Sequence, residues 1–331
     1  MLNERGIAHG RIDLACGYKP KSARYHLDRA SRALVGVARI LFMPRRSSYE
    51  MSIDGGLGLA YNILLAGAAR LRGASMLLYH HSTSYVVNDS RLMRLLLRVS
   101  GSGSVHIACS PRMLALLCER YGMSNETLVL SNAAWIAPSP VPQLPPQPDT
   151  IMLGYIGALW PEKGVLRALE TFKTLRRRRQ NARIQIAGGD IAPEVQAAIE
   201  AAQTEYGSDV AYLGSISDAE KWQFFASLDY FLFPTLYPHE TQSSVAPEAM
   251  SAGVPVIAHD HRFVGEMVGE KGGLLIASDS DFAALAADWI MAGADPTERL
   301  ARRARARAHY ETIYAEAGAQ LETLIQKLVA A

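Results

Sequence analysis

The chain has 331 residues, of which 49% are hydrophobic and 20% are charged, and its formal net charge is +2. That length suffices for two domains with full cores, and no apolar run approaches the roughly 18–20 residues of a membrane span. The opening residues lack the basic-then-apolar order of a signal peptide, and Cys16, Cys109 and Cys118 show neither disulfide nor metal-ligand spacing. We therefore expect a cytoplasmic protein without a structural metal.

The small net charge conceals a basic first half and an acidic second half. Residues 1–148 carry 17 Lys and Arg against 8 Asp and Glu, whereas the remaining residues carry 17 against 24. A basic half indicates an anionic partner such as a membrane face, a lipid phosphate or nucleic acid, although solvated basic helices would look the same. We expect an anionic membrane surface as the partner, and no nucleic acid.

Up to residue 132 the expected elements alternate between short apolar strands and helices. Strands are expected at 49–53, 74–81, 105–110 and 127–132, and helices at 58–73, 91–100 and 111–122. The second of these helices places Arg91, Arg94 and Arg98 on one stripe beside leucines, which suits the headgroup region of an anionic bilayer. A helix packed by its leucines with solvated arginines fits equally well, and the sequence leaves both readings open.

Residues 137–149 hold six prolines, which excludes a helix or a central strand and indicates a semi-rigid linker. We expect an N-terminal domain of residues 1–149 that includes this linker, and a C-terminal domain of residues 150–331. A final helix at about 305–330 is expected to pack back on the N-terminal domain.

Beyond the linker the alternation is clearer. Strands are expected at 151–159, 183–188, 210–214, 229–234, 255–259 and 272–276, and helices at 165–179, 192–206, 217–228, 244–253 and 281–293. Short apolar strands alternating with helices predict two Rossmann-like, doubly wound α/β domains with parallel sheets. Ligands of such sheets bind at the carboxyl ends of the strands, and two such domains leave a cleft for a large ligand.

The segment HETQSSVAPEAM (239–250) follows one of the buried strands. We expect Ser244 to cap a helix there, which leaves Pro247 in the first turn, where an N–H is not needed. The N–H groups of residues 244–246 would then form a phosphate site. Glu240 lies before that site, and Glu248 lies one turn beyond it, where its carboxylate can accept two hydroxyl hydrogens.

The spacing E-x7-E from Glu240 to Glu248, followed by EAMSAGVPVIAH, resembles the signature of retaining family 4 glycosyltransferases of the GT-B fold. The resemblance extends over most of residues 150–331, through GYIGALWPEKG, IAGGD, YLGSIS and GGLLI, and continues weakly in YHHS, IACS and VLSN. It implies an NDP-sugar donor in the C-terminal domain, a saccharide or lipid-linked acceptor in the N-terminal domain, and retention of anomeric configuration. It also implies no metal and no cofactor besides the donor.

Carried over by position, the resemblance assigns individual roles. Lys163 would pair with the diphosphate, Glu240 would contact the transferred sugar, and Glu248 would hold the ribose hydroxyls. His81, or its neighbour His80 instead, would face the sugar and acceptor. The strand ends and the helix start would line the donor site through Gly157, Gly188, Gly214, Ser243, Ser244 and Val245. The leaving diphosphate would itself take the acceptor's proton, so the protein's task is positioning and charge stabilisation.

Three departures from the family pattern bear on these roles. Ala158 stands where the family commonly has an arginine beside the diphosphate, and Ser243 stands where it usually has glycine. Residues 1–30 show no convincing copy of the strand, loop and helix with which the family begins. Either RIDLAC and GYKPKS are a degenerate form of that strand and loop, or this first βα unit is absent or shortened. We favour the second alternative. A non-catalytic nucleotide-sugar-binding subunit is the main rival, and an epimerase of the same architecture fits the signature less well. We expect a peripheral enzyme at the inner membrane face.

Overall fold

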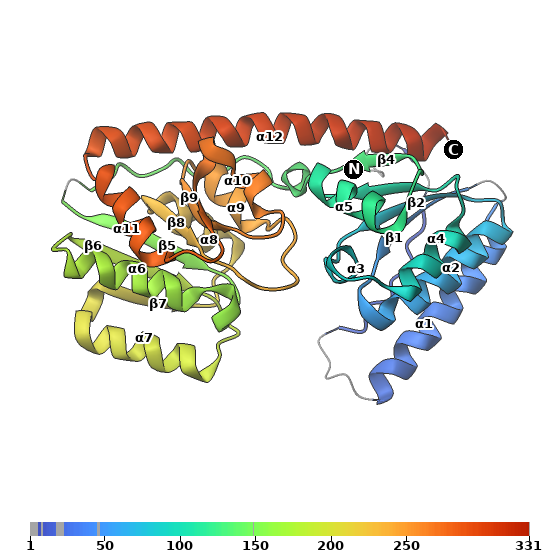
Figure 1. Cartoon of the computed structure of the whole chain (residues 1–331), viewed down its shortest axis with the longest axis horizontal. Helices are drawn as coiled ribbons and strands as arrows, with labels where there is room; N and C mark the ends of the chain where they lie inside the picture. Colours follow the sequence, from blue (N-terminus) through green and yellow to red (C-terminus); the bar gives the residue numbers. More distant parts are fainter. Residues whose placement is uncertain (1–5, 8, 18–22, 45–46, 148, 331) are drawn as a thin grey trace. The chain divides into compact units, whose positions relative to one another are not determined.

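The computed structural model describes residues 6–7, 9–17, 23–44, 47–147 and 149–330. It divides into two compact units (Figure 1): unit 1 comprises Met1–Leu130 and Ala319–Ala331, and unit 2 comprises Ser131–Gly318. Each unit is an α/β layer structure around a parallel sheet, so the expected fold class is confirmed.

The unit boundary lies before the predicted boundary at residues 149 and 150. The proline-rich segment packs along unit 2, because the Leu144 N–H donates to the Ala226 carbonyl at 3.0 Å and the Gln143 side chain donates to the Gly253 carbonyl at 3.0 Å. Proline removes backbone donors from this segment, but these polar groups still hold it against the unit.

Unit 1 contains a four-stranded parallel sheet in the order β1-β2-β3-β4. Its strands are β1 (Ser48–Ile53), β2 (Ser75–His80), β3 (Val105–Ala108) and β4 (Thr127–Val129). Its helices are α1 (Ala23–Phe42), α2 (Leu59–Leu71), α3 (Ser84–Val87), α4 (Arg91–Ser100) and α5 (Pro111–Tyr121). Figure 1 shows α1, α2 and α4 side by side, and these helices contact one another in that order.

Helix α1 is the element that the sequence did not predict. RIDLAC (11–16) joins no sheet, and most of the loop GYKPKS lies outside the described residues. Gly36 lets α1 approach its neighbours, since a Cβ there would lie 2.8 Å from Ile12 and 3.1 Å from Leu65. The sheet of unit 1 therefore begins with the predicted strand at 49–53, without an earlier one among the described residues.

Unit 2 contains a six-stranded parallel sheet in the order β10-β9-β8-β5-β6-β7. Its strands are β5 (Ile151–Ile156), β6 (Ala182–Ala187), β7 (Val210–Gly214), β8 (Tyr230–Phe233), β9 (Val256–Asp260) and β10 (Gly273–Ala277). Its helices include α6 (Val165–Arg177), α7 (Pro193–Tyr206), α8 (Asp218–Ala226), α9 (Val245–Ser251), α10 (Val264–Gly272) and α11 (Phe282–Ala292). The sheet is doubly wound. The first three strands extend it from β5 toward β7, and the chain then returns to add β8 on the other side of β5, so the strand order reverses between β5 and β8.

The two faces of this sheet form two apolar clusters, because side chains alternate along each strand. Tyr230 and Leu232 of β8 belong to the cluster that contains α6, α7 and α11. Phe231 and Phe233 belong to the cluster that contains α8, α9 and α10. A strand buried on both faces reads as a continuous apolar run, which is why YFLF is recognisable in the sequence.

The final helix, α12 (Pro296–Ala330), is longer than predicted, and its residues from Ala319 onward group with unit 1. Its first turns are anchored in unit 2 by a buried ion pair between Arg299 and Asp229 at 3.2 Å. In unit 1 the Ser48 hydroxyl donates to the Leu328 carbonyl at 2.7 Å. None of the helices in the described part of the chain is both long and apolar enough to cross a bilayer.

Candidate functional site

The loops that follow β5 and β8 meet at the point where the strand order of unit 2 reverses. Lys163 ends the short 3₁₀ helix Pro161–Lys163 in the loop after β5, and Glu240 lies in the loop after β8. The carboxyl ends of neighbouring parallel strands lie at one edge of the sheet, and a strand reversal leaves a crevice for ligands there. Both residues therefore lie where the sequence placed a ligand site.

Lys163 and Glu240 form an ion pair in which the glutamate is buried and the lysine is partly exposed. The Lys163 ammonium donates to the Glu240 carboxylate at 3.0 Å, and the Thr235 hydroxyl donates to the same carboxylate oxygen at 3.1 Å. The ammonium also lies 4.3 Å from the ring centroid of Tyr237, a distance suited to a cation–π contact. A lysine held by a carboxylate and an aromatic ring is a fixed positive charge rather than a solvated loop side chain.

The two loops are bonded directly to each other. The Leu236 N–H donates to the Glu162 carbonyl at 2.9 Å. Gly164 has a φ of +88°, and a Cβ there would lie 2.1 Å from the Pro234 carbonyl oxygen, so only glycine fits this approach. The buried Tyr155 hydroxyl donates to the Lys163 carbonyl at 3.2 Å. Lys163 is thereby positioned from both sides.

A second lysine–glutamate pair joins α8 to α9. The Lys221 ammonium donates to the Glu248 carboxylate at 2.9 Å and to the Asp218 carboxylate at 3.2 Å. Burial raises the pKa of Glu248, and the bond from Lys221 opposes that rise. Burial also opposes the charge of Lys221, but the bonds to its two carboxylates outweigh this effect and raise its pKa.

The three predicted glycines are joined by backbone contacts at the ends of β5, β6 and β7. The Gly157 N–H donates to the Ala187 carbonyl at 3.2 Å, and the Gly188 N–H donates to the Gly214 carbonyl at 2.8 Å. A Cβ at Gly188 would lie 2.1 Å from the Gly157 carbonyl oxygen. The strand ends thus pack backbone against backbone at these glycines, and the Tyr212 hydroxyl donates to the Gly188 carbonyl at 3.0 Å.

Helix α9 begins at Val245 after Ser244, and Pro247 is its third residue, as predicted. The Ser244 side chain makes no capping bond, however, and the Val245 N–H donates to the Ser243 hydroxyl at 3.3 Å. The amide of Val245 is therefore engaged by the serine that stands in the family's glycine position. The expectation of three amides directed at a ligand needs this correction at Val245.

His81 and His80 belong to unit 1 and differ in environment. His81 is exposed overall, but its ring lies against Tyr79, and this partial burial of the ring lowers its pKa below the ordinary value. His80 is fully buried, lies 2.9 Å from His106 and 3.0 Å from the Tyr85 hydroxyl, and burial lowers its pKa far more. Since an exposed ring can meet a ligand and a buried one cannot, the geometry favours His81 of the two.

Several residues at the site had no signal in the sequence. Lys221 reads as a solvated helix lysine, and Gln242 reads as a loop residue. In the structure the Gln242 side chain accepts from the Ser131 hydroxyl at 3.1 Å and from the Asn132 N–H at 3.0 Å, which ties the loop before α9 to the start of unit 2. Thr235, which donates to Glu240, does have a signal in the sequence, because it is a polar residue just after the buried strand β8.

Comparison with known proteins gives this fold and site a family. The model of the family "Glycosyl transferases group 1" matches residues 141–308. A lipopolysaccharide 1,2-N-acetylglucosaminetransferase from Salmonella typhimurium is 32% identical over 126 residues, which span 36% of this chain and 33% of that enzyme. The chain belongs to the group 1 glycosyl transferase family, and the match spans about a third of that curated relative.

Solved structures agree with this assignment at the level of the fold. HepE from Anabaena, solved with UDP, is similar with a TM-score of 0.69 at 16% identity, over 90% of this chain and 82% of that one. A sucrose-phosphate synthase from Thermosynechococcus elongatus has a TM-score of 0.68 at 18% identity, over 97% of this chain and 83% of that one. The fold is thus that of GT-B glycosyltransferases.

Proposed function

We propose that this protein transfers a sugar from a nucleoside diphosphate donor to a saccharide or lipid-linked acceptor, in the synthesis of a cell-surface polysaccharide or glycolipid. The observation that carries the proposal is the pairing of both signature glutamates with lysines in unit 2, Glu240 with Lys163 and Glu248 with Lys221. Both pairs lie within the segment that the family model matches. The relatives named above support the type of reaction.

Each side chain has a task that its chemistry supports. Lys163 neutralises the diphosphate as it leaves, Glu240 binds hydroxyls of the transferred sugar, and Glu248 accepts two hydrogen bonds from the ribose. The glycine-lined ends of β5, β6 and β7 receive the base. His81 of unit 1 contacts the acceptor.

The reaction retains anomeric configuration and uses no metal or further cofactor. Lysine supplies the positive charge beside the leaving group, and the leaving oxygen takes the proton of the acceptor hydroxyl. Catalysis then consists of orientation and charge stabilisation, so Glu240 acts without becoming covalently bound. UDP is the first donor nucleotide to test, because HepE was solved with UDP. The protein works peripherally at the inner face of the cell membrane.

Titration calorimetry with UDP, GDP, ADP and dTDP tests the donor site directly. The Glu248→Ala variant should bind the preferred nucleotide about 1.5–3 kcal/mol more weakly, since it loses charge-assisted hydrogen bonds in a buried place. Glu266→Ala on α10 is a matched control that removes a glutamate elsewhere in unit 2. Equal affinity of the wild type and Glu248→Ala for every nucleotide would refute the ribose assignment.

A further inference from the structure

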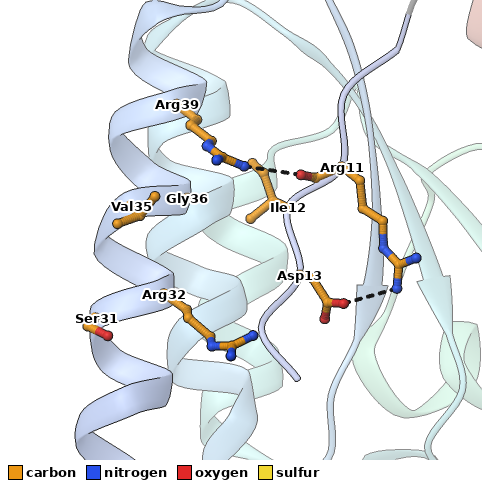
Figure 2. A pocket seen from close by; sticks show the side chains of 8 residues that line it. All are labelled: Arg11, Ile12, Asp13, Ser31, Arg32, Val35, Gly36 and Arg39. Atoms are coloured by element: carbon orange, nitrogen blue, oxygen red, sulfur yellow. Dashed lines mark hydrogen bonds and ion pairs between the residues drawn. The ribbon is translucent and has the colours of Figure 1, made fainter. Parts of the chain in front are cut away.

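Polar side chains that the proposed function leaves unused occur at separate places in unit 1. Some line a hollow of about 420 Å³ beside α1, where Figure 2 shows Arg32 and Arg39 directed toward the segment that carries Arg11. Arg32 donates to the Ala15 carbonyl at 2.7 Å and Arg39 donates to the Arg11 carbonyl at 3.3 Å. These bonds hold the segment against the helix, so local packing accounts for them. The histidines at the end of β2 are different.

His80 and His106 are buried side by side in the sheet of unit 1. His80 ends β2, and His106 lies on the neighbouring strand β3. Both residues are 0% exposed, and Nε2 of His80 lies 2.9 Å from Nδ1 of His106. Buried polar atoms are costly unless they are hydrogen-bonded. The pair is therefore stable only as part of a network in which each ring nitrogen has a partner.

The bonds of Ser104 determine which nitrogens carry hydrogens. Its hydroxyl lies 2.8 Å from the Gly101 carbonyl, which can only accept, so the hydroxyl donates there. The same oxygen must then accept from Nε2 of His106, 3.2 Å away. Burial lowers the pKa of His106 to about 4 and that of His80 well below its ordinary value, so both rings are neutral. Nδ1 of His106 therefore accepts from Nε2 of His80, and Nδ1 of His80 accepts from the Tyr85 hydroxyl at 3.0 Å.

Tyr85 connects this chain of bonds to the segment that carries His81. It lies in α3, and the segment between β2 and α3 begins with His81 and Ser82. The Tyr85 hydroxyl also accepts a hydrogen bond from the backbone of Ser82. The segment is thus fixed at both of its ends, by His80 on the strand and by Tyr85 on the helix, and the two ends are bonded to each other.

The ring of His81 also has a defined neighbour. Its centroid lies 3.8 Å from that of the Tyr79 ring, and the Tyr79 hydroxyl is anchored by donation to the Leu130 carbonyl at 2.9 Å. The loop after β1 packs closely on the same segment, since a Cβ at Gly55 would lie 2.6 Å from the Ser82 hydroxyl oxygen. An exposed ring held in this way is oriented before any ligand arrives.

We propose that the chain of Tyr85, His80 and His106 positions His81 for the acceptor. The three residues are buried and act through the backbone of the segment, so they are positioning residues and not catalytic ones. The inference rests on the role of His81 in the proposed function, and it adds the residues that orient this side chain. Such orientation matters because a displacement of about 1 Å can lower a rate by about 100-fold.

Nitrogen NMR of the histidine rings tests the chain in the wild-type protein. Near neutral pH both His80 and His106 should carry a hydrogen on Nε2 and none on Nδ1, because only these tautomers satisfy the bonds described above. Signals that disappear in His106→Asn and His81→Ala identify two of the rings. A hydrogen on Nδ1 of either His80 or His106, or a charged ring, would overturn the chain.

Tyr85→Phe removes the hydroxyl from the chain and keeps the aromatic ring. The pKa of His81, measured by NMR titration, should rise toward the ordinary value of about 6.5, because its ring leaves Tyr79. Release of diphosphate from the preferred nucleotide sugar, with a lipid extract as acceptor source, should fall about tenfold or more at unchanged nucleotide affinity. His106→Asn retains an acceptor near the position of Nδ1 and should keep most of this rate, whereas His106→Leu should lose it.

Tyr121→Phe is the matched control, because it removes a hydroxyl that donates to the Tyr85 carbonyl at 2.6 Å, outside the chain. It should leave the pKa of His81 unchanged and the rate within about twofold of the wild type. An equal loss in this control would show that any anchor of α3 has the same effect, and the inference would be wrong. An unchanged pKa of His81 in Tyr85→Phe would contradict it as well.

A double variant shows whether the chain acts through His81. In a protein that already carries His81→Ala, Tyr85→Phe should lower the rate no further, because the side chain to be positioned is gone. A further loss of about tenfold would overturn the inference, since independent effects add. A wild type that binds nucleotide sugar and releases no diphosphate would instead refute the proposed function, and the tautomers and the pKa of His81 would then decide the chain by themselves.

Discussion

Lys163 and Glu240 lie 77 positions apart in the chain, yet their side chains meet at 3.0 Å. The lysine is fixed by the carboxylate and the Tyr237 ring, so its charge is oriented at the ends of β5 and β8. An oriented cation acts on a diphosphate without first losing side-chain freedom, which is the condition for strong charge stabilisation.

Lys163→Ala should therefore weaken the binding of a nucleoside diphosphate by about 1.5–3 kcal/mol and leave the affinity for the bare nucleoside nearly unchanged. Calorimetric titration with both ligands measures the difference. Lys271→Ala, at an exposed lysine of α10, controls for the general loss of positive charge in unit 2. Equal losses for nucleoside and diphosphate would place Lys163 in the base site or in the framework instead.

The ion pair with Lys221 affects the protonation of Glu248, so the pH dependence of nucleotide binding tests the role of both residues. Burial raises the pKa of Glu248 above its ordinary value, and Lys221 opposes the rise. Ribose hydroxyls donate to the ionised carboxylate, so nucleotide affinity should fall as the pH drops through that raised pKa. Lys221→Met removes the opposing charge, raises the pKa further and should move this fall to higher pH.

Nucleotide affinity measured from pH 4 to 8 shows the shift, and Lys221→Arg should restore the profile of the wild type. Glu248→Gln is the control that lacks the titrating carboxyl group, so its nucleotide affinity should no longer fall in this pH range. If Lys221→Met lowers affinity equally at every pH, then Lys221 contacts the ligand or the fold and does not act through Glu248.

At the scale of elements, the close contact of β5 and β6 depends on one glycine. A Cβ at Gly188 would lie 2.1 Å from the Gly157 carbonyl, whereas a Cβ at Gly214 would meet nothing within 4 Å. Gly188→Ala should lower the free energy of unfolding by more than about 3 kcal/mol, through overpacking. Gly214→Ala, at a φ of +67°, should cost about 1 kcal/mol of backbone strain.

Urea unfolding of both variants measures the two costs. Equal destabilisation by Gly188→Ala and Gly214→Ala would show that the strand ends can move apart. The strand ends at Gly157 and Gly188 would then not form a fixed framework for the base.

The elements differed in how well the sequence predicted them, for physical reasons. The strands of unit 2 are buried on both faces and so read as uninterrupted apolar runs, as in YFLF of β8. Helix α1 was not predicted, although its sequence has the periodicity of an amphipathic helix, with Ala33, Gly36 and Ile40 on its buried side. The signature glutamates were found by their spacing, but the partner Lys221 was not, because nothing local links α8 to Glu248.

At the scale of the whole molecule, the sequence predicted two α/β parts but put their boundary after the proline-rich segment, whereas the units divide before it. Prolines reveal irregular backbone and not the unit on which it packs, and the bonds of Gln143 and Leu144 assign the segment to unit 2. The family match over residues 141–308 lies entirely within unit 2.

Ala158 is the residue that favours the alternative function, a nucleotide-sugar-binding protein without catalytic activity. It stands where the family commonly has an arginine, and its carbonyl accepts from the Tyr155 hydroxyl at 3.1 Å, so it contributes no cation to a diphosphate. A protein that binds the donor without transferring the sugar would still show every binding effect described above. Only turnover separates the two functions.

The most direct measurement is the release of nucleoside diphosphate from a panel of UDP-, GDP-, ADP- and dTDP-sugars, by the wild type and by Lys163→Ala, in the presence of a lipid extract as acceptor source. The account predicts repeated turnover with one donor and a loss of about 100-fold or more in Lys163→Ala, since leaving-group stabilisation of this kind contributes roughly 3–4 kcal/mol. Tight binding of a nucleotide sugar with no release of its diphosphate, or equal release by Lys163→Ala, would contradict it.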